Sequence, residues 1–350
     1  MNAVDSRLPV ALIGLGAIGR AHAERLQRHP QVRLAAVAEP SAAGREFAAS
    51  LGVPCFEHHE AMFDATPSAR AAVVATPNAT HLAVGLACIA RGLPTLMEKP
   101  VADTLAAGEA LCAAAEAAGV PLMVAHHRRL NPIARRAREL VRAGVLGRPV
   151  AAQAMATWFK PPGYFDAAWR REPGGGTVLI NLIHDIDLLR YLLGDVIHVQ
   201  AVTSHSVRGL PVEDTAAVLL RFANGALATL LVSDTAVSPW NWDLAAGEAA
   251  HYPRQEVDAF FLSGTEGALT LPRLQCWRYA GAKGWHEPLS VERSALHAAD
   301  PYMAQLSHLG AVAEGREAPV CSGRDGLASL RVALAVHEAA ASGQPVSLGV

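Results

Sequence analysis

The chain has 350 residues, of which 51% are hydrophobic and 18% charged, and its formal net charge is −2. This length predicts two domains with sizeable cores, and the near-neutral balance excludes partners such as nucleic acids and anionic membranes. The five cysteines are scattered without a CxxC pair, which argues against a disulfide framework or a metal site and favours the cytoplasm. The short apolar run at 10–19 is broken by glycine and predicts neither a signal peptide nor a membrane span.

A glycine motif of the form GxGxxG lies between a buried strand at 10–13 and a helical pattern at 20–28. In this context the first glycine allows a tight turn, the second lets the backbone approach a pyrophosphate, and the third lets helix and strand pack closely. The helix N-terminus faces the phosphates. The alternative, a generic glycine turn, does not explain the flanking strand and helix. The predicted phosphate-binding residues are Gly14, Gly16, Ala17, Ile18 and Gly19.

An acidic residue ends the second predicted strand. The strand at 32–38 is followed by Glu39, which stands 20 residues after Gly19, where an acid is expected to bind the adenine ribose hydroxyls. A carboxylate there would repel a 2′-phosphate, so NAD is predicted over NADP. The alternative role for Glu39 is to cap the helix that begins near Ser41, as a helix N-terminus attracts acids.

Two further buried strands, at 71–75 and 93–97, also end in polar residues. In an open α/β sheet, ligands bind just outside the carboxyl ends of the strands. The residues expected there are Thr76, Pro77, Asn78, Glu98 and Lys99. The ammonium of Lys99 is suited to stabilising negative charge on a substrate oxygen, although a solvated surface charge is the alternative. Asn78 has a rival role as N-cap of a helix at 82–90, and the bond between Lys99 and Pro100 is a candidate for the cis form.

Strands and helices alternate up to residue 127, which predicts an α/β Rossmann domain with a doubly wound parallel sheet over 1–127. Residues 128–350 predict an α+β domain with a large open, mostly antiparallel sheet. Its strands are expected at 150–158, 196–207, 215–222, 226–237, 257–262, 268–271 and 275–279. Helices at 176–193, 301–314 and 322–341 are expected to cover one face, with 322–341 free to pack back towards the first domain. The uncovered face predicts a homodimer or homotetramer.

A second run of glycines, at 174–176, opens an apolar helix that carries Asn181, His184 and Asp187. Residues three apart share a helix face, so Asn181 and His184 should lie together. A histidine has an ordinary pKa of about 6.5, which suits it to accept a proton at neutral pH. A core histidine bonded to a helix carbonyl is the alternative.

These motifs, in this order, resemble the Gfo/Idh/MocA family of NAD(P)-dependent sugar and polyol oxidoreductases over nearly the whole chain. The resemblance rests on Gly14–Gly19 with His22, Thr76–Asn78 with His81, Glu98–Pro100, Arg128–Pro132, and Gly174–Gly176 with His184 and Asp187. It implies that Lys99 and His184 are catalytic, that His81 and Glu98 belong to the cofactor site, and that the chain forms dimers or tetramers. One departure stands out. The family commonly has an aspartate four residues before the histidine, where this chain has Ile180 followed by Asn181.

The sequence therefore predicts an oxidoreductase that moves a hydride between NAD and a secondary alcohol or ketone of a sugar, polyol or sugar acid. Aromatic and cationic residues at 158–171 favour a polyhydroxylated substrate. The expected substrate-binding residues are His127, Arg129, Asn131, Lys160, Tyr164, Trp169, Arg170, Asn181 and His184. Two alternatives stay open: a glycoside-cleaving enzyme that uses NAD as a transient redox cofactor, and a non-catalytic NAD-binding regulator.

Overall fold

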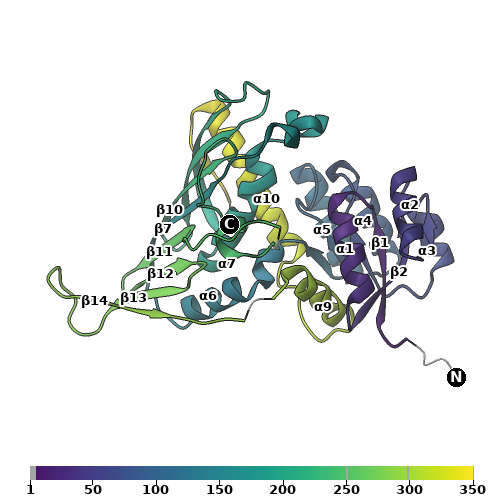
Figure 1. The fold of residues 1–350 in the computed structure, drawn as a ribbon, viewed down its shortest axis with the longest axis horizontal. Helices are drawn as coiled ribbons and strands as arrows, with labels where there is room; N and C mark the ends of the chain where they lie inside the picture. The colour runs from purple at the N-terminus through teal and green to yellow at the C-terminus, as the bar shows by residue number, and fades with distance from the viewer. Residues whose placement is uncertain (1–4, 250, 298, 350) are drawn as a thin grey trace. The chain divides into compact units, whose positions relative to one another are not determined.

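The computed structural model describes residues 5–249, 251–297 and 299–349, and the chain divides into two compact units. The first unit comprises the residues up to Leu130 together with Asp300–Leu330. The second comprises Asn131–Ala299 and the residues from Arg331 onward. Figure 1 shows that each unit has its own sheet with helices packed on it.

The first unit contains a six-stranded sheet in the order β3-β2-β1-β4-β5-β6, with every neighbouring pair parallel. This order reverses direction at β1, which is the doubly wound arrangement predicted from the sequence. Its strands are nearly continuous apolar runs because helices cover both faces. The bounds are β1 (Leu8–Ile13), β2 (Val32–Ala38), β3 (Cys55–Phe56), β4 (Ala71–Val74), β5 (Thr95–Met97) and β6 (Leu122–Val124).

Two helices of the first unit begin at a polar side-chain cap. The Ser41 hydroxyl accepts a hydrogen bond from the Gly44 amide, and Thr104 does the same for Ala107. The bounds are α1 (Ala17–Arg28), α2 (Ala42–Ser50), α3 (His59–Ala65), η1 (Asn78–Thr80), α4 (His81–Ala90), α5 (Leu105–Ala118) and η2 (His127–Leu130).

One helix from the end of the chain also belongs to the first unit. Helix α9 (Pro301–Ala313) contributes Leu306, Leu309 and Val312 to the same core as the strands β1 and β2. The expectation that 301–314 covers the second sheet is therefore wrong. Its apolar pattern predicts a packed helix but does not specify which sheet receives it, because that choice depends on contacts distant in sequence.

The second unit contains a nine-stranded sheet in the order β14-β13-β12-β11-β7-β10-β9-β8-β15. Among the described strands of this second sheet, only the β7–β10 pair is parallel, so the prediction of a large, mostly antiparallel sheet is confirmed. The bounds are β7 (Pro149–Thr157), β8 (Val196–Ser204), β9 (Thr215–Phe222), β10 (Leu227–Ser233), β11 (Phe260–Gly264), β12 (Ala268–Leu271), β13 (Gln275–Tyr279), β14 (Leu289–Arg293) and β15 (Val346–Ser347).

Helices cover one face of this sheet. Helices α6 (Pro132–Arg142), α7 (Ile183–Leu193) and the later part of α10 (Gly323–Ser342) share one apolar core with the strands. The shorter elements of the unit are η3 (Pro162–Asp166), η4 (Ala168–Arg171), η5 (Val178–Leu182) and α8 (Trp242–Ala246).

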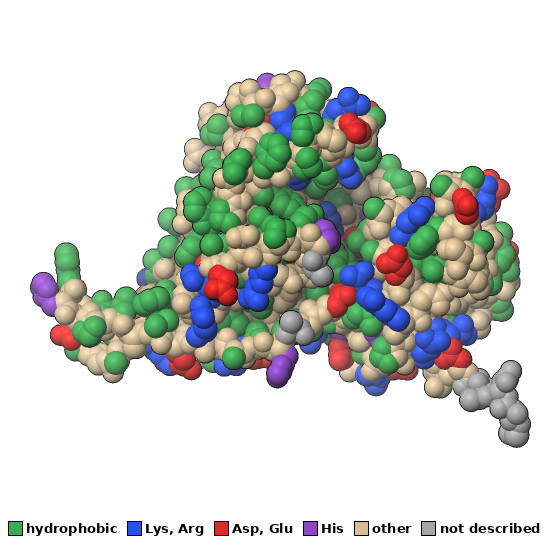
Figure 2. Space-filling model, in the orientation of Figure 1, with side chains coloured by type: hydrophobic (Ala, Val, Ile, Leu, Met, Phe, Trp, Pro, Cys, Tyr) green, Lys and Arg blue, Asp and Glu red, His purple; other side chains and the backbone are tan. Residues whose placement is uncertain are grey.

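The other face of the nine-stranded sheet carries exposed apolar side chains. Val202, Leu219, Leu231 and Phe261 are all exposed there, and hydrophobic side chains are prominent along this side of the second unit in Figure 2. The alternation of buried and exposed residues along β9 is that of a strand with one packed face.

Three chemical features of the described residues bear on function. No described helix has both the length and the hydropathy needed to cross a bilayer. The five cysteines are free thiols. No cluster of metal-ligating side chains occurs among the residues that the structure describes.

Candidate active site

The glycine loop of the first unit fits a dinucleotide. Gly14 adopts a φ of +93°, and a Cβ at this position would lie 2.5 Å from the Ala75 carbonyl oxygen. A Cβ on Gly19 would overlap the Gly14 carbonyl oxygen, so both positions require glycine. A Cβ on Gly16 would instead meet no atom within 4 Å, and Gly16 caps α1 without any side-chain hydrogen bond. The first amides of α1 are therefore available to an anion such as a pyrophosphate.

Glu39 closes this loop from the end of β2. Its Oε2 accepts a hydrogen bond of 2.6 Å from the Leu15 amide, and its Oε1 accepts one of 2.8 Å from the Ser41 amide. Burial raises the pKa of this carboxyl, but the hydrogen bonds from Ser41 and Leu15 and the charge of Arg20 lower it overall. Ser41, not Glu39, is the N-cap of α2. An ionised carboxylate has about four lone-pair sites, so Glu39 retains capacity for a ribose hydroxyl.

The carboxyl ends of β4 and β5 bring the next predicted residues to the same edge of the sheet as the glycine loop, because β1, β4 and β5 are neighbours. Asn78 is exposed in η1. It does not cap the following helix, because Thr80 takes the N-cap position of α4. Lys99 is half-buried directly after β5, and the bond between Lys99 and Pro100 is cis.

His81 connects the two strand ends. Its Nδ1 lies 2.9 Å from the Pro100 carbonyl oxygen and its Nε2 lies 3.0 Å from the Thr76 carbonyl oxygen. Burial lowers the pKa of His81, so the neutral ring donates to one of these carbonyls. The His81 side chain is fully buried and both ring nitrogens face backbone carbonyls, so a direct contact of His81 with the cofactor stays a prediction. Its role is to hold the loops that carry Thr76 and Lys99.

A buried hydrogen-bond network lies beside Lys99. The Glu98 carboxylate accepts a 2.8 Å hydrogen bond from Nε2 of His22, a residue of α1 that is fully buried. Burial raises the pKa of Glu98, whereas the hydrogen bond from His22 and the charge of Lys99 lower it, and the pKa falls below its usual value. Tyr302 of α9 stacks on His127 at 4.4 Å and meets His22 edge-on at 6.0 Å. Glu98 thus places a fixed negative charge beside Lys99.

The residues after β6 are more engaged in the fold than the sequence predicts. Arg129 is 3% exposed, and its guanidinium donates to the Val320 carbonyl at 3.0 Å. Asn131 caps α6 through its Oδ1 and donates from Nδ2 to Glu248 at 2.7 Å. The side chains of Arg129 and Asn131 are engaged in contacts within the fold, and these contacts do not support the predicted role of either residue in binding substrate. His127 is buried by its stacking on Tyr302.

The second unit presents His184 at the start of α7, directly after a π-helical turn, η5. Such turns occur often at functional sites. Asn181 lies inside this turn. The prediction that Asn181 and His184 share one helix face assumes ordinary α-helical spacing, which the π-helical turn does not have. The Asn181 Oδ1 accepts a 2.5 Å hydrogen bond from Nζ of Lys160, whose residue is 4% exposed.

The glycines before this turn are required by the chain itself. A Cβ on Gly175 would overlap the Trp169 carbonyl oxygen, and one on Gly176 would overlap the Glu213 carboxylate. Glu213 accepts a 2.9 Å hydrogen bond from the Val178 amide and therefore fixes the entry to η5. Sequence reasoning missed Glu213, which lies in a connection far along the chain and belongs to no motif.

A group of aromatic and charged residues surrounds Lys160. Nζ of Lys160 lies 4.6 Å from the centroid of the Tyr164 ring, and the Arg170 guanidinium lies 3.8 Å from the same centroid. Trp169 is 53% exposed, and Arg170 lies 5.2 Å from its ring. The predicted substrate-binding residues Lys160, Tyr164, Trp169, Arg170 and Asn181 are thus brought together. Arg208 and Asp234, which the sequence analysis did not identify, form a 2.7 Å ion pair beside them.

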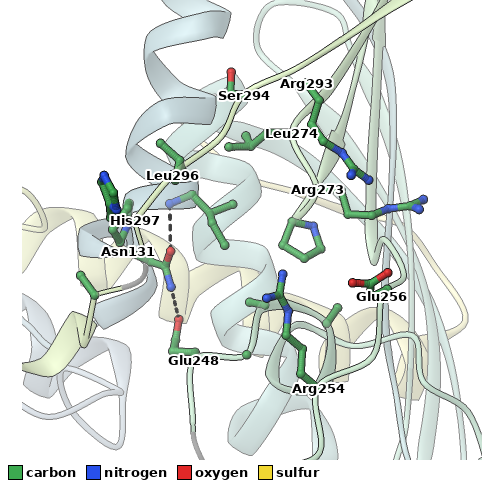
Figure 3. A pocket seen from close by; sticks show the side chains of 17 residues that line it. Asn131, Glu248, Arg254, Glu256, Arg273, Leu274, Arg293, Ser294, Leu296 and His297 are labelled. Atoms are coloured by element: carbon green, nitrogen blue, oxygen red, sulfur yellow. Dashed lines mark hydrogen bonds between the residues drawn. The ribbon is translucent and has the colours of Figure 1, made fainter.

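A separate pocket of about 220 Å³ lies elsewhere in the second unit. Figure 3 shows Arg254, Glu256 and Arg273 on one side of it and Asn131 with Glu248 on the other. Asn131 is the only predicted site residue that lines it, so this pocket is not the candidate active site.

Trp242 stabilises the wall behind this pocket. It is fully buried, and its Nε1 donates to Glu248 at 2.8 Å. Trp240 is 45% exposed.

Comparison with known families identifies the chain. Residues 8–126 match an oxidoreductase family with an NAD-binding Rossmann fold, and residues 134–270 match the GFO/IDH/MocA C-terminal domain. The chain belongs to the Gfo/Idh/MocA family of oxidoreductases. The Gfo/Idh/MocA resemblance inferred from the motifs is confirmed, and so are the fold and NAD as the cofactor.

Individual relatives agree with this assignment. A 1,5-anhydro-D-fructose reductase of Ensifer adhaerens is 31% identical over 288 residues, which cover 81% of this chain and 80% of the relative. A scyllo-inositol 2-dehydrogenase (NAD(+)) of Bacillus subtilis is 26% identical over 360 residues, covering 99% and 98%. The WlbA dehydrogenase of Bordetella pertussis, solved with NADH and UDP-GlcNAcA, has a TM-score of 0.80 at 23% identity and covers 98% of this chain and 99% of its own. This structure shares the fold.

Proposed function

We propose that this Gfo/Idh/MocA enzyme is an NAD-dependent dehydrogenase of a sugar-like polyol or sugar acid, and that Lys99 and His184 are its catalytic residues. The observation that carries the proposal is the placement of Lys99. It follows β5, at the same sheet edge as the uncapped glycine loop that fits a pyrophosphate. The names of the relatives, which include inositol dehydrogenases and an anhydrofructose reductase, support a polyhydroxylated substrate.

The chemistry divides between cofactor and protein. Bound NAD supplies the hydride acceptor for the carbon that bears the hydroxyl. The Lys99 ammonium stabilises the negative charge that grows on the substrate oxygen, and one such donor contributes about 3 kcal/mol to lowering the barrier. The His184 imidazole accepts the hydroxyl proton. The buried Glu98 carboxylate keeps a compensating negative charge beside the Lys99 ammonium.

The residues around His184 support a role for Lys160 and Asn181 in holding the substrate. Ile180 offers no acid to orient the imidazole, whereas the Asn181 side chain is held by Lys160. We assign substrate contacts to Lys160, Tyr164, Trp169, Arg170, Asn181 and His184. Cofactor contacts fall to the glycine loop, Glu39, Thr76, Pro77, Asn78 and Lys99.

The test is a screen of polyols, aldoses and sugar acids for NADH absorbance, followed by the substitution Lys99→Ala. We expect turnover to fall by about 100- to 1,000-fold while NADH still binds, because the lysine acts on the reacting oxygen. Near-normal turnover in this variant would refute the catalytic assignment. Sugar release from a glycoside without net NADH would instead favour the glycoside-cleaving alternative.

We propose further that the enzyme works in the cytoplasm as a homodimer or homotetramer assembled through the open face of the nine-stranded sheet. The five free cysteines support a reducing compartment. The exposed apolar side chains of that face support self-association, because large exposed apolar patches mark interaction sites.

A further inference from the structure

We propose that the second unit binds a carboxylate of the substrate at Lys160 and Arg170, so that the enzyme acts on a sugar acid in preference to a neutral polyol. This inference rests on the proposed function and narrows its substrate class. Its basis is that two cations, Lys160 from the loop after β7 and Arg170 from η4, lie close to the single ring of Tyr164. The Lys160 Nζ lies 4.6 Å from the ring centroid and the Arg170 Cζ lies 3.8 Å from it.

Two cations on one ring repel each other, and the ring does not neutralise them. An aromatic face attracts a cation through its quadrupole but carries no formal charge. Burial raises the pKa of the Tyr164 phenol, so it stays neutral at physiological pH. The arrangement becomes electrostatically favourable when an anion lies beside the two cations, and a substrate carboxylate meets that need.

The buried carboxylate of this region is already paired with another cation. Asp234 is 3% exposed and accepts a 2.7 Å hydrogen bond from Nε of Arg208, whose Nη2 also donates to the Lys160 carbonyl oxygen at 2.9 Å. Burial raises the pKa of Asp234, and the charges of Arg208 and Lys160 lower it in part. Arg208 therefore offsets the charge of Asp234 directly, through the ion pair.

Arg170 has a donor to spare. One Nη1–H bonds the Tyr164 carbonyl oxygen, whereas its buried Nε finds no hydrogen-bond partner among the described residues. A guanidinium presents its N–H groups as a planar fork that matches a carboxylate. The neighbouring Trp169 ring is 53% exposed and offers a face to the carbon chain of a sugar acid.

The proposed carboxylate site is linked to the proposed base through Lys160. The Nζ that faces Tyr164 also donates to Asn181, which lies in the π-helical turn preceding His184. An anion held by Lys160 is therefore fixed relative to the backbone that carries His184. Ile180, in the same turn, adds no negative charge that would repel it.

The test compares acids with their neutral counterparts: D-gluconate with D-sorbitol, D-galactonate with galactitol, and D-glucuronate with D-glucose. The variants are Arg170→Gln and a matched control, Arg171→Gln, which alters the exposed neighbouring arginine. We expect the wild type to prefer an acid, and Arg170→Gln to lower kcat/KM for that acid about 10- to 100-fold, a loss several times larger than for the matched neutral compound, because only the acid loses the ion pair. Arg171→Gln should leave both unchanged. D-sorbitol 6-phosphate tests whether a phosphate is bound instead.

Three results would overturn the inference: equal or better turnover of the neutral compounds, a preference for the phosphate, or equal losses for acid and neutral substrates in Arg170→Gln. In each case the dehydrogenase function would still stand. If no compound is oxidised, the proposed function fails, and the carboxylate site is judged by binding alone. Saturable quenching of tryptophan fluorescence by D-gluconate should then occur in the wild type and disappear in Arg170→Gln. Unchanged quenching would refute the site.

Discussion

Glu98 is the residue that stabilises the charged, ammonium form of Lys99. The carboxylate is buried, bonded to His22 and flanked by the charge of Lys99. An ammonium and a carboxylate held side by side stabilise each other's charged forms, because each lowers the free energy of the other's ionised state. Under the proposed catalytic role of Lys99, the charge of Glu98 acts on the reaction through Lys99 and not through contact with substrate.

The substitution Glu98→Gln tests this positioning role. Gln keeps an oxygen that can accept the His22 hydrogen bond but removes the negative charge, so the Lys99 ammonium loses its proton at lower pH. We expect the alkaline limit of kcat to move to lower pH, with KM for NAD changing little. The measurement is the pH profile of kcat, with the exposed Glu57→Gln as control. An unchanged profile combined with reduced stability would mean that Glu98 only supports the fold.

The same carboxyl makes a prediction about acid stability. Because the pKa of Glu98 is lowered in the folded state, its contribution to stability is present above the ordinary value of 4.5 and is lost as the pH falls through the folded-state pKa. The free energy of unfolding should therefore differ most between the wild type and Glu98→Gln above pH 4.5. Urea unfolding at a series of pH values should show the difference shrinking on acidification, and a difference that grows would contradict the lowered pKa.

Glu39 carries the prediction for cofactor choice. Replacing Glu39 with Ser removes the charge that would repel a 2′-phosphate, so the ratio of kcat/KM for NADP to that for NAD should rise about tenfold or more. NAD affinity should also fall, because Glu39 holds the glycine loop through the Leu15 amide. Glu46→Gln, an exposed acid on the same helix α2, is the matched control. A constant cofactor ratio would show that Glu39 only holds the loop.

For single residues, the sequence predicts those site positions that are defined by a local motif. The glycine loop, Glu39 and Lys99 could be identified because each follows a strand at a fixed spacing. The hydrogen bond between His22 and Glu98 joins residues 76 positions apart, and no periodicity reports it. His81 was placed in the cofactor site by its motif, whereas the fold buries it between two loops. A motif names a residue but does not say which way its side chain points.

Among the elements, α9 has the placement that a sequence pattern specifies least. Its apolar residues are buried in the core of the first unit, together with β1 and β2, although residues 131–299 of the second unit lie between them in the sequence. Its start is clear from sequence, since Asp300 caps it and Pro301 occupies the first turn. The core that receives it is fixed only by tertiary packing.

The substitution Leu309→Ala tests this placement. Leu309 is fully buried, so its truncation should lower the free energy of unfolding by about 2 to 5 kcal/mol. The loss should appear in the unfolding transition that NAD stabilises, since α9 belongs to the unit with the glycine loop. Thermal unfolding with and without NAD is the measurement, and Leu86→Ala, at 39% exposed, is the control. A loss confined to a transition insensitive to NAD would contradict the assignment of α9.

The π-helical turn η5 and the edge strand β14 are two further elements that the sequence does not predict. The apolar run at 176–193 predicts one continuous helix, but the structure inserts η5 before α7, where Glu213 bonds the Val178 amide. β14 pairs with β13 although all its residues are exposed, so it lacks the buried face that identifies a strand. In contrast, β9, β12 and β13 begin and end as predicted, because their patterns are local.

At the scale of the whole molecule, the open face of the nine-stranded sheet is the surface from which assembly is predicted. Leu231 and Val202 lie on this face and are 39% and 71% exposed. Leu231→Arg should shift the enzyme to monomers, because a charge in an apolar interface is costly to bury. Size-exclusion chromatography with light scattering measures the change. Val237→Arg, on the connection after β10 at 91% exposure, is the control. A wild-type monomer would end the oligomer proposal.

The division of the chain has a consequence for biosynthesis. Residues 131–299 form an insertion within the cofactor unit, whose remaining piece, 300–330, supplies α9 and the segment whose Cys321 carbonyl bonds the edge strand β6. A ribosome that has released only the first 130 residues has therefore made an unfinished nucleotide-binding fold with apolar surface still uncovered. NAD affinity should appear in nascent chains only after residue 330 has left the exit tunnel, by which time most of the inserted unit is already available to fold.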